Sequence, residues 1–255
     1  MKRIIMPLMS VSLLITALTQ AYGQDIKSAV AGKNIIKINL PSVALKNYSM
    51  QYERVINNRQ SIGLGFAVSP NTGLPFKSTL LEQFGGNDDA RKAIETTTFS
   101  KFTITPEYRF YVGKKGAPAG FYLAPFARYT SMSFDQDYTF TPGSGKLHTA
   151  HLTGKFSGVG GGLMIGAQWL LGEHVTLDWW ILGPFVGSMK ADFHGKDDMS
   201  DMTAQDKAEL EGDIESVDIP LWKIDATVGN NEIKAKLDGP FYGARAFGLS
   251  LGFRF

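Results

Sequence analysis

The last ten residues, AFGLSLGFRF at 246–255, alternate between large apolar and small side chains. This period of two is typical of a β-strand with one apolar face and one nearly bare face. Chain ends usually fray in water, so a strongly apolar strand at the end of the chain needs a partner strand. In a sheet that closes on itself the last strand pairs with the first, and such a closed sheet leaves no free edge.

The start of the chain predicts export. MKR carries two positive charges, an uncharged apolar run follows at 4–19, and small residues stand at Ala21 and Gly23. This order is that of a secretory signal peptide. The apolar run is short for a membrane span and contains Pro7, which disfavours a permanent anchor. We therefore expect a signal peptide at 1–23 and one exported domain at 24–255.

The composition narrows the class of that domain. Without Lys2 and Arg3 the 26 basic residues become 24, equal to the 24 acidic residues, so no net charge favours nucleic acid. The chain has no cysteine, which excludes a lipid-modified N-terminal cysteine and disulfides. No later run is long and apolar enough for a membrane helix. Hydropathy alone suggests a soluble secreted protein, whereas the alternation does not.

Strand-like runs recur along the exported chain, and several reach the roughly 9–11 residues that a tilted strand needs to cross a bilayer. Three connections between them are tight: 57–60, 113–120 and 172–174. Three others are long: 69–98, 135–154 and 190–241. The eight runs are 34–40, 48–56, 61–68, 99–112, 120–134, 155–171, 175–189 and 242–255.

Short and long connections therefore alternate, although the connection after the first run is also short. An even strand number with short periplasmic turns and long extracellular loops is typical of outer-membrane barrels. A secreted β-sandwich has no reason to separate its loops in this way. The sequence predicts an all-β fold: an eight-stranded antiparallel transmembrane β-barrel in the bacterial outer membrane.

Two further features bear on this prediction. Aromatic residues fall near both ends of the strands, as expected for rings at the two membrane interfaces. Pro106, Pro125 and Pro184 lie within strands, and each is expected at a bulge because proline cannot donate to the ladder. The aromatic residues are Tyr52, Phe110, Phe121, Trp169, Trp179, Phe253 and Phe255 near the turns, and Phe102, Tyr129, Phe156, Phe185 and Phe241 near the loops.

Residues that alternate with the apolar positions should face the interior. Three of the charged ones are positive and three negative, which predicts ion pairs across a narrow interior rather than a ring of one sign that selects ions. An eight-stranded barrel is just wide enough for side chains to fill. A conducting channel is the alternative. The six residues are Lys37, Glu53, Glu107, Arg109, Arg128 and Asp178, and inward glycines such as Gly63, Gly65, Gly158, Gly160 and Gly162 would make room for them.

The segment 191–218 holds ten acidic residues against Lys196 and Lys207. Part of it, DMTAQDKAELEG at 201–212, predicts a short surface helix. A hairpin that turns at Gly229–Asn230 should follow and extend the last strand. Hard cations favour carboxylates. The segment has no EF-hand spacing, however, so a solvated acidic surface is the favoured interpretation.

The sequence offers little for catalysis. His148 and His151 are three residues apart, which is too little for a metal site. Ser144 and His148 could act as nucleophile and base, as in lipid-modifying outer-membrane hydrolases, but no nucleophile elbow surrounds them. We therefore predict no enzyme, and no catalytic, cofactor-binding or metal-binding residue.

Four stretches resemble a family of uncharacterised Gram-negative outer-membrane barrels that carries only a domain of unknown function. They are NIIKINLPSVALKNYSMQYERVI at 34–56, LPFKST at 74–79, TITPEYRFYVGKKGAPAGFYLAPFARY at 103–129 and GPFYGARAFGLSLGFRF at 239–255. The resemblance implies fold and location and supplies no activity. A terminal aromatic strand, here with Phe253 and Phe255, resembles the signal that the outer-membrane insertion machinery recognises.

The expected role is structural, or interaction with an unidentified extracellular partner through the loops. The expected partners are outer-membrane lipid, lipopolysaccharide and the insertion machinery, with no nucleic acid. The alternatives are a narrow pore or a transporter of small hydrophobic molecules, and, less favoured, a lipid-modifying enzyme.

Overall fold

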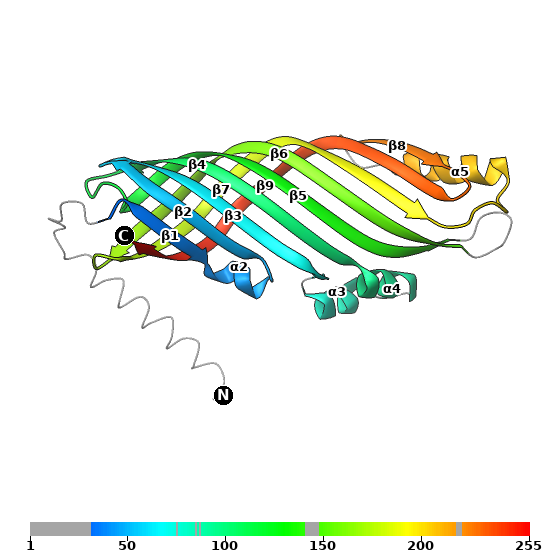
Figure 1. Ribbon diagram of the computed structural model, residues 1–255, viewed down its shortest axis with the longest axis horizontal. Coiled ribbons are helices and arrows are strands. Elements are labelled where there is room, and N and C mark those ends of the chain that lie inside the picture. The colour runs from blue at the N-terminus through cyan, green and yellow to red at the C-terminus, as the bar shows by residue number, and fades with distance from the viewer. Residues whose placement is uncertain (1–31, 75, 85, 87, 141–147, 218–220) are drawn as a thin grey trace, which may run out of the picture.

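The computed structural model describes residues 32–74, 76–84, 86, 88–140, 148–217 and 221–255 (Figure 1). The expected signal peptide at 1–23 lies outside these residues. Nine strands dominate the chain: β1 (Asn34–Asn39), β2 (Tyr48–Asn57), β3 (Gln60–Gly73), β4 (Thr98–Val112), β5 (Gly120–Phe140), β6 (His148–Leu171), β7 (Val175–Lys196), β8 (Lys223–Val228) and β9 (Glu232–Arg254). The helices are α2 (Leu40–Ala44), α3 (Lys77–Phe84), α4 (Asp88–Thr96) and α5 (Ala204–Glu215).

Strands β1 to β7 and β9 form a closed ring of eight, so the all-β prediction and the strand number are confirmed. Every pair of neighbours is antiparallel. The ring closes between β1 and β9, where Ile35 pairs with Arg254 and Ile38 with Leu251. The apolar C-terminal strand is thus paired on both sides, with β7 and with β1. The short strand β8 pairs with β9 beyond the ring.

Connections separate by end, as predicted. The tight turns after β2, β4 and β6 lie at the end of the ring that holds the C-terminus, whereas α5 and β8 lie at the opposite end (Figure 1). The predicted surface helix and the hairpin at Gly229–Asn230 are both present, as α5 and as β8 with β9. No helix in the described part of the chain is long and apolar enough to cross a membrane.

Two of the long loops expected from the sequence, 135–154 and 190–241, are shorter than predicted because the strands on both sides of them extend further. Strand β5 runs to Phe140 and β6 begins at His148, whereas β7 runs to Lys196 and β9 begins at Glu232. These four strands have 21–24 residues each. In these extensions backbone pairing continues through both polar pairs, such as Lys155–Asp192, and apolar pairs, such as Ala191–Leu237. The third loop, 69–98, contains the end of β3 and helices α3 and α4.

The prolines do not create the expected bulges. Between β4 and β5 the pairing stops after Ile104–Tyr129, resumes at Glu107–Phe126 and keeps its register across Pro106. A second gap in the same ladder spans Pro125, again without a shift. Pro184 lies in a similar gap between β6 and β7, and the shift in that ladder comes later, between Ile165 and Gly166. The missing N–H therefore interrupts one ladder locally rather than adding a residue.

Beyond the ring, α5 and β8 cover the extended strands. Met199, Met202 and Ile233 form a small buried apolar cluster with Ala150, against which Leu210 and Ile214 of α5 pack. The backbone N–H groups of Ala226 and Val228 in β8 donate to the carboxylates of Glu215 and Glu211. These bonds occupy donors of an edge strand that would otherwise be open to pairing with another chain.

Candidate functional site

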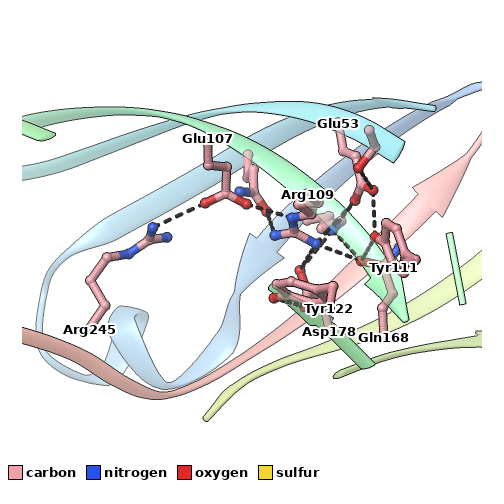
Figure 2. A network of polar contacts seen from close by, with 11 residues as sticks. Glu53, Glu107, Arg109, Tyr111, Tyr122, Gln168, Asp178 and Arg245 are labelled. Carbon is pink, nitrogen blue, oxygen red and sulfur yellow. Dashed lines mark hydrogen bonds and ion pairs between the residues drawn. The ribbon is translucent and has the colours of Figure 1, made fainter. Parts of the chain in front are cut away.

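The interior of the ring holds a buried ion-pair network, shown in Figure 2. Arg109 of β4 contacts three carboxylates, at 2.6 Å from Glu107, 2.8 Å from Asp178 and 3.3 Å from Glu53. Lys37 of β1 pairs with Glu53 and, at 2.7 Å, with Asp178. These five side chains come from four strands and are each at most 6% exposed. The structure thus brings together five of the six charged residues that the sequence placed inside.

Neutral polar groups complete the network. Arg109 also donates to the amide oxygens of Gln51 and Gln168, at 3.0 and 2.8 Å. The hydroxyl of Tyr111 donates to Glu53 at 2.7 Å, and that of Tyr122 donates to Asp178 at 2.8 Å (Figure 2). A buried charge is strongly unfavourable unless it is paired and hydrogen-bonded. Each carboxylate here has a cation and at least one further donor or a second cation, so the network holds the interior in one arrangement.

Inward glycines make space for these side chains. A Cβ atom at Gly63 would lie 2.9 Å from Cγ of Glu107, and one at Gly252 would lie 2.8 Å from Cγ of Lys37. A Cβ at Gly166 would overlap the ring of Tyr122. The glycines that alternate with apolar residues along the strands therefore face inward, and the charged side chains pack against them.

Arg128 does not join the network, contrary to the sequence-based expectation. Its Nε donates to Thr130 at 3.4 Å, and its guanidinium lies 5.5 Å from the centre of the Phe185 ring. In the described part of the chain it makes no ion pair. Arg245 joins the network where Arg128 was expected to. Its side chain is 8% exposed and lies 3.0 Å from Glu107 (Figure 2).

The sequence missed Arg245 because β9 changes phase. Ser250 and Gly252 face inward at even positions, whereas Arg245 faces inward at an odd one. Strand β7 changes phase with it: Asp178 is buried at an even position, and Phe185 packs inside at an odd one, near Phe126. The irregularity of the β6–β7 ladder between Ile165 and Gly166 marks the place. Strict alternation counted from the C-terminus puts Arg245 outside.

The same phase change corrects the expected aromatic belts. Phe102 and Tyr129 are exposed on the outer face, as are most of the aromatic residues near the turns. Phe185 and Phe241, however, pack edge to face with each other at 4.9 Å inside the ring. Phe156 packs against Phe134 and Phe193 at the loop end. The belt near the loops is therefore sparser than the sequence suggested.

A pocket of about 410 Å³ lies between the network and helix α2. Its lining includes Gln51 of the network, Arg128, Arg245 and Trp180, with polar residues of β1, β2 and β4 around them. Pro41 and Leu45 of the α2 region add apolar surface. Side chains therefore leave this part of the interior unfilled.

The remaining residues singled out in the sequence lie elsewhere. Phe253 and Phe255 are 57% and 49% exposed at the closing seam, where the backbone of Phe255 bonds to Asn34. Their role as an insertion signal stays a prediction. His148 is buried and bonds Asp197 at 2.7 Å, and Ser144 lies outside the described residues. Within the described ranges, no group of three or more His, Asp or Glu residues is placed to hold a metal ion.

Comparison with known proteins identifies a family, but that family has no known activity. No curated protein and no solved structure matches the chain. The family described as "Protein of unknown function (DUF3575)" matches residues 9–213, which is most of the chain. The protein therefore belongs to the DUF3575 family.

Proposed function

We propose that this protein is an integral β-barrel of the bacterial outer membrane whose interior is plugged by ion pairs and whose loop end carries an interaction surface. It has no enzymatic role in this proposal. The observation that carries the proposal is the polarity of the ring, which is apolar outside and charged inside. A protein in water has the opposite arrangement, with charged side chains almost never fully buried.

The apolar outer face extends around the whole ring. Large exposed apolar residues occur on each of its eight strands, for example Ile38 on β1, Leu163 on β6 and Leu251 on β9. On β4 the outward apolar residues run from Phe102 to Val112, a stretch matching the about 9–11 residues of a membrane-crossing strand. Monomeric soluble proteins rarely expose apolar patches of more than a few hundred Å². Lipid, including lipopolysaccharide, is the partner that such a belt fits.

The filled interior argues against a pore. Arg109, Glu53 and Asp178 are each 0% exposed, so solvent does not reach these side chains in the middle of the interior. A selective channel would carry a ring of one sign around an open path. The same charged interior is a poor route for small hydrophobic molecules. We therefore expect a closed barrel that does not conduct.

The loop end supports an interaction role. Helix α5 has no buried residue, and its exposed face carries acidic side chains such as Glu209 and Asp213. The capping box between Thr203 and Asp206 begins the helix, and the bonds from β8 to Glu211 and Glu215 hold it in place. A fixed acidic surface is suited to a basic partner or to lipid-associated cations.

Fractionation of the cell envelope tests the location. The full-length chain should be found in the outer-membrane fraction, and on a denaturing gel its mobility should shift on boiling. A soluble periplasmic protein without a shift would overturn the proposal.

Planar-bilayer recording tests the plug. Native protein should be silent across the physiological voltage range. Steady unitary currents would instead support the pore. The variant Arg59→Gln is a control, because Arg59 is exposed in the β2–β3 turn. This substitution should also give no current.

A further inference from the structure

We propose that the pocket between the ion-pair network and α2 binds a small organic anion, a carboxylate with a short apolar body. This inference goes beyond the location and the plug. It depends only on the closed ring, so binding and membrane insertion can fail separately.

The interior holds more cations than carboxylates. Its carboxylates Glu53, Glu107 and Asp178 are all engaged by Lys37 and Arg109, and Glu107 is shared with Arg245. Arg128 lines the pocket without an ion pair among the described residues. A largely buried charge without a counter-ion is unfavourable, so an anion in the pocket would stabilise it.

Aromatic rings hold the two arginines of the pocket lining in place. Arg245 lies 4.4 Å from the ring centre of Trp180 and 4.9 Å from that of Phe126. Phe126 packs edge to face on Phe185 at 6.3 Å, and Arg128 lies over Phe185. The aromatic rings thus hold both guanidinium groups, of which Arg245 also pairs with Glu107 and Arg128 makes no ion pair among the described residues. Guanidinium is the group best matched to a planar carboxylate, because it presents parallel N–H donors.

Two buried hydrogen-bond donors in the pocket lining have no partner among the described residues. Gln51 is 3% exposed, and its Oε1 accepts from Arg109, whereas its buried Nε2 has no partner among the described residues. The buried Nε1 of Trp180 has none either. Both residues line the pocket. A buried donor left unsatisfied is costly, and native proteins rarely leave one without a ligand or water.

The composition of the wall sets the class of ligand. No Asp or Glu lines the pocket within the described residues, so an anion meets no repulsion from its wall. Pro41 and Leu45 of the α2 region add apolar surface to the lining. A volume of about 410 Å³ is in the lower part of the usual range for small-molecule sites, about 300–1,000 Å³. A small organic acid fits this combination better than inorganic phosphate, which has no apolar part.

Isothermal titration in an uncharged detergent tests the proposal with benzoate as the probe. Inorganic phosphate and benzylamine are the comparison ligands. Native protein should bind benzoate saturably, with phosphate weaker and benzylamine not bound. Arg128→Gln should weaken benzoate binding about tenfold or more, because a charge-assisted hydrogen bond is lost. Arg59→Gln makes the same change at the opposite end and should bind benzoate as native protein does.

Three results would overturn the proposal: no saturable binding of benzoate to native protein, equal affinity in Arg128→Gln, or tighter binding of phosphate than of benzoate. The heat-dependent mobility shift shows whether each variant is folded. Trp180→Phe provides a second test, since it keeps the ring and removes one unused donor. It should weaken benzoate binding by a smaller factor, and unchanged affinity would exclude Trp180 from the site.

Discussion

Replacing Arg109 by methionine should remove the centre of the interior network while keeping the length and packing of the side chain. Arg109 contacts Glu107, Asp178 and Glu53 at 2.6–3.3 Å, and all of these groups are buried. Its removal leaves Glu53 and Asp178 sharing Lys37.

The expected loss in the free energy of unfolding is about 3–5 kcal/mol, the usual effect of removing one partner from a buried ion pair. Most of this loss reflects carboxylates that stay buried with too little positive charge, rather than the strength of one contact. The variant Glu107→Gln combined with Arg109→Met should therefore lose less than the sum of the two single variants, because each relieves part of the imbalance left by the other.

The assay is urea unfolding of the protein in lipid vesicles, with the folded fraction read from the fast band of unboiled gel samples. Arg54→Met is the matched control, because Arg54 is exposed and bonds only to Asn34, at 3.1 Å, among the contacts described. An exposed polar contact of this kind is worth at most about 1 kcal/mol. If Arg109→Met cost no more than Arg54→Met, the network would not be what stabilises the interior.

Four further predictions concern other parts of the molecule. Gly166→Val should destabilise the protein by about 1–3 kcal/mol in the same urea assay, because the new side chain overlaps the buried ring of Tyr122. Leu163→Arg should cost about 2–4 kcal/mol in vesicles if this outward position lies near the bilayer midplane, and little if the outer face is in water. Thr203→Ala should speed amide hydrogen exchange in α5, because it removes the N-cap. Hydrogen bonds from Thr203 lower the pKa of Asp206, so their support of α5 is present above the ordinary pKa and is lost as pH falls through the lowered one; hydrogen exchange in α5 should therefore accelerate in acid.

Much of the ring was predictable from local patterns. The alternation around Arg109 and Phe110 shows which side chains share a face, and the tight turns show which strands are neighbours. The paired C-terminal strand follows from its apolar face, since such a face is stable at a chain end only if it is paired. All six charged residues that alternation placed inside lie inside, and five of them join the ion-pair network.

The tertiary structure decided three features that alternation in the sequence cannot predict: a change of phase along a strand, the length of the strands and the register between distant strands. The phase change in β7 and β9 puts Arg245 inside, and no residue type near it signals the change. The extension of β5 to Phe140 is invisible to a pattern that depends on apolar side chains. Register between distant strands sets which cation meets which carboxylate, as when Lys37 of β1 meets Asp178 of β7.

The physical reason is that some features depend on neighbouring residues alone, whereas others depend on residues far apart in the sequence. The direction of a side chain along a strand is a local property with a period of two, so the sequence by itself determined the two faces of the ring and the polarity of each. Ring closure, strand stagger and local irregularities depend on all eight strands together. Only the closed structure could therefore decide that Arg128 meets no carboxylate among the described residues and that a pocket lies beside it.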